Sequence, residues 1–369
     1  MKKVHRHIGS VLTKLLLVFN ILLIVMLLLS AFGGYINPHT FGWEVSLGLL
    51  FPFLAVATFA FMVAWLIVGS KKWLWSFGAL LLCVGKLHTY CPVSMPQPVP
   101  KGSIKVVSYN TYGFGSGLKD SVAQAQMIDY LHHSDADLFC AQESHYNLKY
   151  KEAVENAVAH WQYSDSVYSS KSWNALTLYS NYPILDRHII RSSSPGHMCV
   201  IYRVKIESDT VYVVNCHFIS NSINPEDKAT YQKLVTISDR DSTSEDFLRL
   251  GRKVNDAGLR RAEQADSLAR YLEQLGDKPV IVCGDFNESP LGYVHTRLCR
   301  LLDDAYTASG NGPGITYHLN RMYFRLDNIL CSRHWRSFGA RVDSRQKMSD
   351  HYPIETWLKR VKDRKNDTA

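Results

Sequence analysis

The sequence lacks the cysteine patterns of zinc sites. Its eight cysteines include no CxxC pair and no Cys/His spacing of the kind that holds zinc. Cys140, Cys216, Cys283 and Cys331 lie within apolar, strand-like runs, where cysteine commonly acts as a small buried hydrophobe. No internal repeat is evident either. The cysteines therefore indicate no zinc module, and the sequence selects no disulfide pair.

Acidic residues are almost absent from the first part of the chain. Residues 1–101 contain eight basic residues and one acid, Glu44, which gives +7 of the total net charge of +8. The other 268 residues hold 33 basic and 32 acidic groups. The soluble part thus lacks the basic excess expected of a protein that binds nucleic acid tightly along its backbone. A local basic patch remains open.

Long apolar runs, in contrast, are concentrated before residue 91. Runs over about 12–32 and 45–68 are long enough to cross a hydrocarbon core of roughly 30 Å. A third run over 73–90 is interrupted by Lys86 and His88 near its end. A signal peptide is the alternative for the first run, and a Trp-rich interfacial segment for the third. We therefore expect a transmembrane region over 1–91 with two to three helices.

The basic residues also predict the orientation of these helices. Residues 33–44 contain no Lys or Arg, whereas basic residues flank the runs at Lys2, Lys3, Arg6, Lys14, Lys71 and Lys72. The positive-inside rule then places the N-terminus and Lys71 in the cytoplasm. With three spans the soluble domain lies outside, and with two it lies inside. We expect an integral inner (cytoplasmic) membrane protein with an extracytoplasmic domain.

Residues 92–102 form a proline-rich linker that is predicted to be extended and to hold the soluble domain off the bilayer. Beyond the domain, 359–369 is predicted to be a basic tail. A long polar segment over 220–256 has no strand pattern and indicates an insertion with some helix, either a lid or a plain surface insertion.

The soluble domain is predicted to combine strands with outer helices. Helical periodicity covers Ser121–His132 and Ala257–Leu275. Short runs rich in Val, Ile, Tyr, Leu and Cys, each bounded by polar or turn residues, predict strands. These runs are 104–109, 137–141, 175–179, 199–206, 211–216, 280–283 and 326–331. Strands outnumber helices and several follow each other directly, so we expect an α+β layered domain.

Six polar clusters lie at or beside these strands. They are Ser108-Tyr109-Asn110-Thr111, Gln142-Glu143-Ser144, Asn215-Cys216-His217, Gly284-Asp285-Phe286-Asn287, Leu326-Asp327-Asn328 and Ser349-Asp350-His351-Tyr352-Pro353. Each cluster alone is weak, because an Asn or Asp after a strand usually closes a turn. Together they supply the oxygen ligands of a hard cation and an acid/base pair.

The residue types suggest specific roles. Glu143, beside Asn110, would offer oxygen ligands to Mg²⁺. Asp285 and Asn287, two residues apart after a strand, would position a water and a phosphate oxygen. A carboxylate in an apolar run needs a partner, and His351 is the natural one for Asp327.

In their order, Asn–Glu–His–GDxN–Asp–SDHxP, these motifs resemble the endonuclease/exonuclease/phosphatase (deoxyribonuclease-I-like) superfamily over residues 103–358, in a membrane-anchored, bacterial-type member. The resemblance implies a four-layer α/β/β/α sandwich. It implies metal ligation by Glu143, Asn110 and Asp350, and catalysis by His217, Asp285, Asn287, Asp327 and His351. It also implies substrate binding by Asn174, His217 and Asn287.

The expected function is therefore a membrane-anchored, Mg²⁺-dependent phosphoesterase, with Mn²⁺ as a possible substitute. The substrate stays open between nucleic acid, a phospholipid head group and a small phosphoester, and the tether slightly favours lipid. The expected partners are this substrate and the bilayer, with no obligate protein partner. The alternative is a catalytically silent, membrane-tethered binding domain on the same fold.

Overall fold

The computed structural model describes residues 2–40, 42, 44–146, 148–169, 172, 174–221, 226–227, 244–319 and 322–361. After residue 103 the chain forms two mixed sheets of six strands each. The first sheet contains β1 (Ile104–Asn110), β2 (Leu138–Gln142), β3 (Tyr163–Tyr168), β4 (Ala175–Ser180), β11 (Trp335–Val342) and β12 (Ile354–Arg360), in the order β11-β12-β1-β2-β4-β3. The second contains β5 (Ile184–Arg191), β6 (Met198–Ile206), β7 (Asp209–His217), β8 (Val280–Asp285), β9 (Asp303–Asp304) and β10 (Asp327–Cys331), in the order β5-β6-β7-β8-β10-β9.

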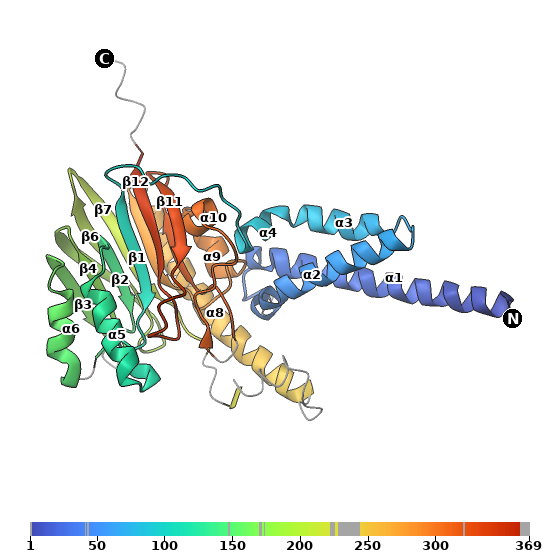
Figure 1. Ribbon diagram of the computed structural model, residues 1–369, viewed down its shortest axis with the longest axis horizontal. Helices are drawn as coiled ribbons and strands as arrows, with labels where there is room; N and C mark the ends of the chain where they lie inside the picture. The colour runs from blue at the N-terminus through green and yellow to red at the C-terminus, as the bar shows by residue number, and fades with distance from the viewer. Residues whose placement is uncertain are drawn as a thin grey trace, which may run out of the picture.

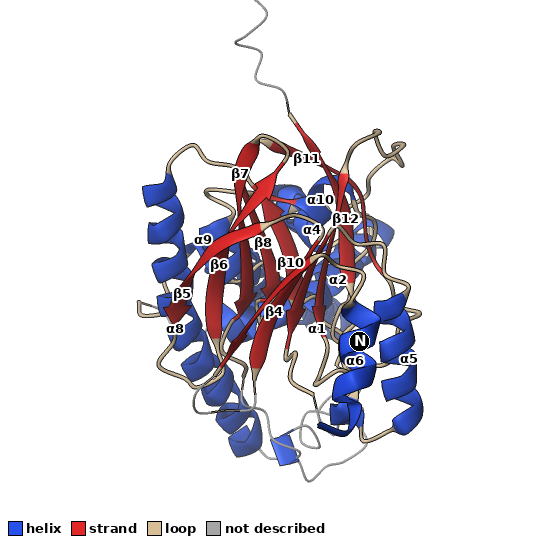
Figure 2. Cartoon of the chain, turned by 90° about the vertical axis from the view of Figure 1, so that its left-hand side faces the viewer, coloured by secondary structure: helices blue, strands red, loops and turns tan. Residues whose placement is uncertain are grey.

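The sheets pack face to face because successive strand residues point to opposite sides. Val106 belongs to the core between the sheets, whereas its neighbour Val107 faces the outer layer of α5 (Ser121–His132) and α6 (Lys151–Val158). On the other sheet, Val214 packs against α8 (Ser244–Leu275) and α9 (Tyr293–Leu298). Figure 2 shows helices flanking both sheets. The predicted four-layer α/β/β/α sandwich is confirmed.

The predicted strands and the two predicted helices are present, with ends that differ by a few residues. The largest difference is α8, which begins at Ser244 instead of 257. Residues 222–225 and 228–243 of the predicted insertion lie outside the described residues. Strand β12 continues through Arg360, two residues into the predicted basic tail, whose positions 362–369 also lie outside them.

Among the described residues, four helices precede the sheets: α1 (Lys2–Phe32), α2 (Glu44–Ile67), α3 (Trp73–Leu82) and α4 (Val84–Tyr90), with a 3-10 turn η1 (Gly33–Tyr35) after α1. Two stretches, Val11–Tyr35 and Leu47–Ile67, are long and apolar enough to cross a membrane. The third apolar run is divided at Cys83 into α3 and α4. Figure 1 shows these helices as a bundle that projects from one side of the sandwich.

A buried polar group joins three of these helices. The Asn20 amide of α1 donates to Ser76 Oγ of α3 at 2.9 Å, and its oxygen accepts from the Trp65 indole of α2 at 3.1 Å. Asn20 and Ser76 are fully buried. A buried polar group is costly when it is unpaired, so this arrangement fixes how α1, α2 and α3 pack on one another.

The helical bundle docks directly on the sandwich. Leu291 of the loop before α9 is buried among Leu27, Ala31 and Phe51 of the bundle. At the same contact a Cβ on Gly34 would lie 2.2 Å from the Leu291 carbonyl oxygen, so only glycine allows this close approach.

The linker has no helix or strand, and it does not separate the domain from the bundle. Its backbone binds the domain instead: Ser94 N donates to Asn311 at 2.8 Å, and Gly312 N donates to the Pro92 carbonyl at 2.9 Å. The reason is that proline lacks an N–H but keeps its carbonyl acceptor, which a neighbouring loop satisfies here.

Candidate active site

The predicted site residues meet because their strands are neighbours in register. In the second sheet His217 of β7 and Asp327 of β10 are both paired with Asp285 of β8. In the first sheet the end of β1 at Asn110 is paired with Gln142, which precedes Glu143. The two sheets therefore bring these residues together from strands that are far apart in the sequence.

Gly284 permits the close pairing of β7 and β8 at this end. Its φ is +149°, and a Cβ there would lie 2.0 Å from the Cys216 carbonyl oxygen. A larger residue would push Asp285 away from His217.

Asp285 lies at the centre of the site and is almost fully buried. One carboxylate oxygen accepts from the Asn287 backbone N–H at 2.8 Å, and the other from the Asn110 amide at 3.1 Å. The second oxygen is 3.8 Å from His217 Nε2 and 3.7 Å from His351 Nε2. These last two distances are too long for hydrogen bonds, so an oxygen atom of a water or a substrate can bridge them.

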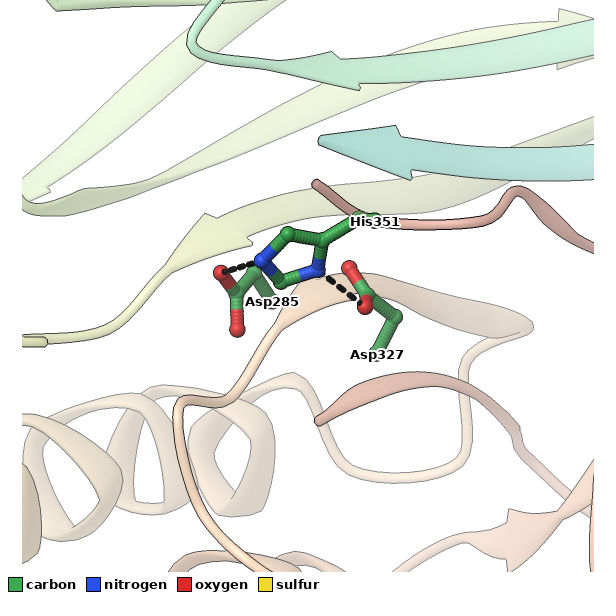
Figure 3. A group of neighbouring side chains, drawn as sticks. All are labelled: Asp285, Asp327 and His351. Atoms are coloured by element: carbon green, nitrogen blue, oxygen red, sulfur yellow. Dashed lines mark hydrogen bonds and ion pairs between the residues drawn. The ribbon is translucent and has the colours of Figure 1, made fainter. Parts of the chain in front are cut away.

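His351 and Asp327 form a buried hydrogen-bonded pair, with His351 Nδ1 2.7 Å from the Asp327 carboxylate (Figure 3). Burial acts to lower the pKa of His351, but the Asp327 and Asp285 carboxylates outweigh it and raise this pKa to about 10. Burial raises the pKa of Asp327 as well, and we assign the shared proton to His351. His351 is therefore a cation at neutral pH that points its Nε2–H at Asp285.

His217 is held differently. Its Nδ1 is 3.0 Å from the Asn174 amide, which leaves Nε2 facing Glu143 and Asp285 at 3.8 Å each. Burial lowers the pKa of His217, so its neutral form is favoured. With Asn174 donating to Nδ1, the proton of the neutral ring lies on Nε2, where it is available to a phosphoryl oxygen.

Glu143, Asp350 and Asn110 lie beside these groups. Burial and the Asp350 carboxylate raise the pKa of Glu143 to about 7. Two carboxylates that repel each other in this way are stabilised by a divalent cation, and oxygen ligands suit Mg²⁺. Asn110 is oriented with its amide nitrogen toward Glu143 at 3.2 Å, and its oxygen accepts from Tyr112 N. Its role as a metal ligand requires the amide to turn over, and it stays a prediction.

Asp285, Asp327 and His351 also satisfy the geometry of a metal site, because one ligand atom from each lies within 4.8 Å of the others. However, His351 and Asp327 are already hydrogen-bonded to each other. The nitrogen ligand would also suit a transition metal better than Mg²⁺. We therefore favour the Glu143 side of the site for a hard cation.

Asn287 has a positive φ of 51° and donates its amide to the Phe218 carbonyl at 2.9 Å. It thereby connects the loop after β8 to the loop after β7, directly beside His217. Asn287 has the geometry of a residue that shapes this edge of the site, and its predicted contact with a phosphate oxygen remains a prediction.

Other members of the polar clusters form a network between the sheets below the site. Gln142 donates to Asn215 at 2.8 Å, and the Asn215 amide donates to the Ala141 and Thr177 carbonyls at 3.0 Å each. These residues are fully buried and bridge the first sheet to the second. Their role is to fix the relative position of the sheets and hence of the site residues.

Sequence reasoning missed His197 and the role of Tyr317. The His197 ring packs on His217 with centroids 4.9 Å apart, and Ser220 N donates to its Nε2. Tyr317 contacts the His351 ring edge to face, with ring centroids 5.1 Å apart. Neither has a sequence signal of its own, because their partners are distant in the chain.

A cavity of about 800 Å³ lies elsewhere, between the linker, α10 (Ala305–Ser309) and β11. Its buried polar residues are already paired, since His295 lies 3.1 Å from Asp304 and Thr307 donates to the same carboxylate. The chemistry described above is not in this cavity, and we assign it no part in the reaction.

Among solved structures, beta toxin from Staphylococcus aureus is similar to this chain, with a TM-score of 0.50, 17% identity, and coverage of 69% of this chain and 100% of that chain. An endonuclease/exonuclease/phosphatase from Bacteroides vulgatus gives a TM-score of 0.49, 13% identity, and coverage of 71% and 100%. The human Nocturnin catalytic domain with bound sulfate gives 0.49, 15%, and coverage of 72% and 97%. At these identities the beta toxin match supports the fold alone.

Curated proteins gave no match. A family model described only as a domain of unknown function matches residues 13–90, the helical region. A second model, described as "Endonuclease/Exonuclease/phosphatase family", matches residues 107–351, which is well over half of the chain. The chain therefore belongs to the endonuclease/exonuclease/phosphatase family.

Proposed function

We propose that this protein is a Mg²⁺-dependent phosphoesterase anchored in a membrane by its N-terminal helices. The observation that carries the proposal is the convergence of two histidines on one carboxylate oxygen of Asp285, with His217 Nε2 at 3.8 Å and His351 Nε2 at 3.7 Å. An acid, a neutral donor and a carboxylate base around a gap fit the hydrolysis of a phosphoester by water.

Each residue has a role in this reaction. Asp285 accepts a proton from the attacking water. The Asn110 amide and the Asn287 N–H hold the Asp285 carboxylate in place. His351, supported by Asp327, and His217, supported by Asn174, stabilise the charge that develops on the phosphoryl oxygens. A cation held by Glu143 and Asp350 would offset further negative charge on those oxygens.

The exposure of the helical bundle supports membrane anchoring. Apolar side chains on the outside of α1 are largely exposed, at 63% for Leu15, 57% for Phe19 and 59% for Leu22. The core helix of a soluble protein would bury such residues, and only 22% of each candidate span is buried. A cleaved signal peptide does not fit the bonds of Asn20 to Trp65 and Ser76. These helices fit a lipid-embedded bundle.

The bundle also supports a location outside the cytoplasm. Figure 1 shows that η1 and the end of α4 lie beside the sandwich, whereas the turn between α2 and α3 lies at the opposite end of the bundle. That turn carries Lys71 and Lys72. If α3 and α4 together return through the membrane, the positive-inside rule places the catalytic domain on the extracytoplasmic side.

This topology predicts which face of the membrane exposes Cys91, which is exposed in the structure directly after α4. A membrane-impermeant maleimide is expected to label Cys91 in intact spheroplasts, and the label should disappear in Cys91→Ser. A cysteine introduced by Ser70→Cys, beside Lys71, should react only after lysis. Labelling of Ser70→Cys alone in intact spheroplasts would show the reverse orientation.

The proposed activity is tested with the full-length protein in detergent or nanodiscs. We expect Mg²⁺-dependent release of p-nitrophenol from bis(p-nitrophenyl) phosphate or p-nitrophenyl phosphate. A chelator should abolish this release, and Mg²⁺ or Mn²⁺ should restore it. A panel of DNA, RNA, phospholipids and small phosphoesters extends the test. Magnesium binding with no hydrolysis across this panel would instead support a silent binding domain.

The pKa of Glu143, about 7 without a cation, predicts how metal affinity changes with pH. Mg²⁺ requires the carboxylate form, so the proton competes with it below this pKa, and affinity should fall by up to roughly tenfold per pH unit. Calorimetric titration of Mg²⁺ between pH 5.5 and 8.5 measures this. Glu143→Gln, which cannot titrate, should bind more weakly with a flatter pH dependence. Equal affinity of the wild type at both ends of the range would contradict the prediction.

A further inference from the structure

The catalytic loops themselves carry the contacts to the helical bundle. Asn287 and Leu291 belong to the same loop after β8, and four residues span at most about 14 Å. Leu291 is buried among Leu27, Ala31 and Phe51, which lie in or beside the two candidate spans. Asn287 is therefore within about 14 Å of Leu291, the domain residue that is buried against the end of the bundle.

A second loop makes the same connection. Arg325 is two residues before Asp327, and its buried guanidinium donates to the Thr89 carbonyl in the last turn of α4 at 2.7 Å. It also packs over the Tyr306 ring at 5.0 Å. The loop that ends at Asp327 is thus attached to the outer end of the bundle, independently of Leu291.

The orientation of the strands shows where the site lies relative to the bundle. Further hydrogen bonds join Asn37 to the Tyr293 hydroxyl at 3.2 Å and Tyr293 to Asp266 of α8 at 3.0 Å. Figure 1 shows the strands of the first sheet crossing the direction of the bundle, so the strand ends lie to the side of the domain and not at its far pole. The site therefore lies on a flank of the domain.

The head-group layer of a bilayer extends roughly 5–8 Å beyond the hydrocarbon on each side. With the two candidate spans in a bilayer, lipid phosphates would lie beside the end of the bundle on which Leu291 packs. We propose that the physiological substrate is the head-group phosphodiester of a phospholipid in the leaflet next to the catalytic domain. This inference rests on the proposed function and names its substrate class.

The reaction adds one water to the lipid diester. A bond forms between the water oxygen and phosphorus while Asp285 takes a proton, and one P–O ester bond breaks. The alcohol that leaves takes up a proton, so the products are an alcohol and a phosphomonoester. No oxidant or further reactant is needed.

The test uses the full-length protein reconstituted in vesicles of phosphatidylethanolamine, phosphatidylglycerol and phosphatidylcholine with Mg²⁺. Lipid in the same vesicle should be hydrolysed at least roughly tenfold faster than labelled lipid in added protein-free vesicles, because the anchor raises its effective concentration. Hydrolysis should stop at about half of the lipid, since only one leaflet of the bilayer is accessible. Phosphorus NMR and mass spectrometry follow the products, with bis(p-nitrophenyl) phosphate as the soluble reference.

A substitution at the contact between the bundle and the sandwich distinguishes access to membrane lipid from the chemical step. Gly34→Leu collides with the Leu291 backbone, whereas Gly78→Leu is a matched control because a Cβ at Gly78 meets nothing within 4 Å. Gly34→Leu should lower lipid hydrolysis in the same vesicle by roughly tenfold or more relative to hydrolysis of the soluble ester. Gly78→Leu should change neither rate.

The outcomes distinguish the two proposals. Hydrolysis of the soluble ester without hydrolysis of any vesicle lipid, or equal rates for lipid in the same and in separate vesicles, would overturn the lipid assignment alone. Faster turnover of an RNA or DNA oligonucleotide than of lipid would do the same. Absence of all Mg²⁺-dependent hydrolysis would overturn the proposed function.

Discussion

Replacing Asp285 by asparagine should lower kcat by about 10²- to 10⁴-fold at saturating Mg²⁺, because the amide cannot accept a proton from water. The substitution keeps the shape of the side chain, and an oxygen remains to accept from the Asn287 N–H at 2.8 Å. The new NH₂ group would face the Asn110 amide, and Asn110 can turn over to present its oxygen. The fold should therefore be retained while the base is lost.

Kinetics and unfolding measured on the same preparations test this expectation. Asp209→Asn is the matched control, since Asp209 is an exposed aspartate on β7 that pairs with Arg360 far from the site. It should keep wild-type kcat. If Asp285→Asn retained more than a tenth of wild-type kcat with Mg²⁺ bound, another group would have to be the base.

The buried strands of the fold are predictable from the sequence, whereas edge strands and short helices are not. Strands such as β8, whose six residues are all buried, contain a continuous apolar run, here Val280–Cys283, that identifies them. Edge strands do not: β5 is mostly exposed and contains Asp186, Arg187 and His188, so no apolar pattern indicates it. Short helices such as α9 and α10 are missed because they provide too few turns for a period.

The site is predictable as a set of residues but not as a geometry. Each polar cluster follows or begins a strand, which indicates one edge of a sheet without giving distances. The orientation of the Asn110 amide depends on Tyr112 N and two carboxylates from other strands, and no local pattern encodes it. His197 reaches His217 only because β6 and β7 are paired at their ends.

The junction between bundle and sandwich could not be derived from sequence at all. It depends on a close approach of Gly34 to the Leu291 carbonyl, and both residues have ordinary sequence surroundings. A proline-rich linker predicted separation, yet apolar contacts and the Arg325–Thr89 hydrogen bond hold the two parts together. The tether alone favours lipid only slightly, and this contact strengthens the proposal of a lipid substrate, because a domain docked on the spans would meet lipid phosphates more often than a loosely tethered one.

The second large effect on activity is expected from the protonation of His351. Asp327 contributes most of the attraction that raises the pKa of His351 to about 10, despite the opposing effect of burial. A protonated His351 is needed as the cationic donor, so wild-type activity should be maintained through neutral pH and fall as the pH rises past about 10. His351→Ala should lose about 10²- to 10⁴-fold in kcat at every pH.

Asp327→Asn should move this alkaline limit downward. Without the carboxylate at 2.7 Å, the pKa of His351 falls toward the ordinary value of about 6.5, although Asp285 still raises it. At pH 8 much of the variant would then hold a neutral His351, whereas the wild type would remain cationic. Profiles of kcat/KM between pH 6 and 10.5 measure the shift.

Asp277→Asn is the matched control, because Asp277 pairs with His334 at 3.1 Å on the surface. A variant profile that coincided with the wild type would show that the Asp327–His351 pair does not set the protonation state used in catalysis.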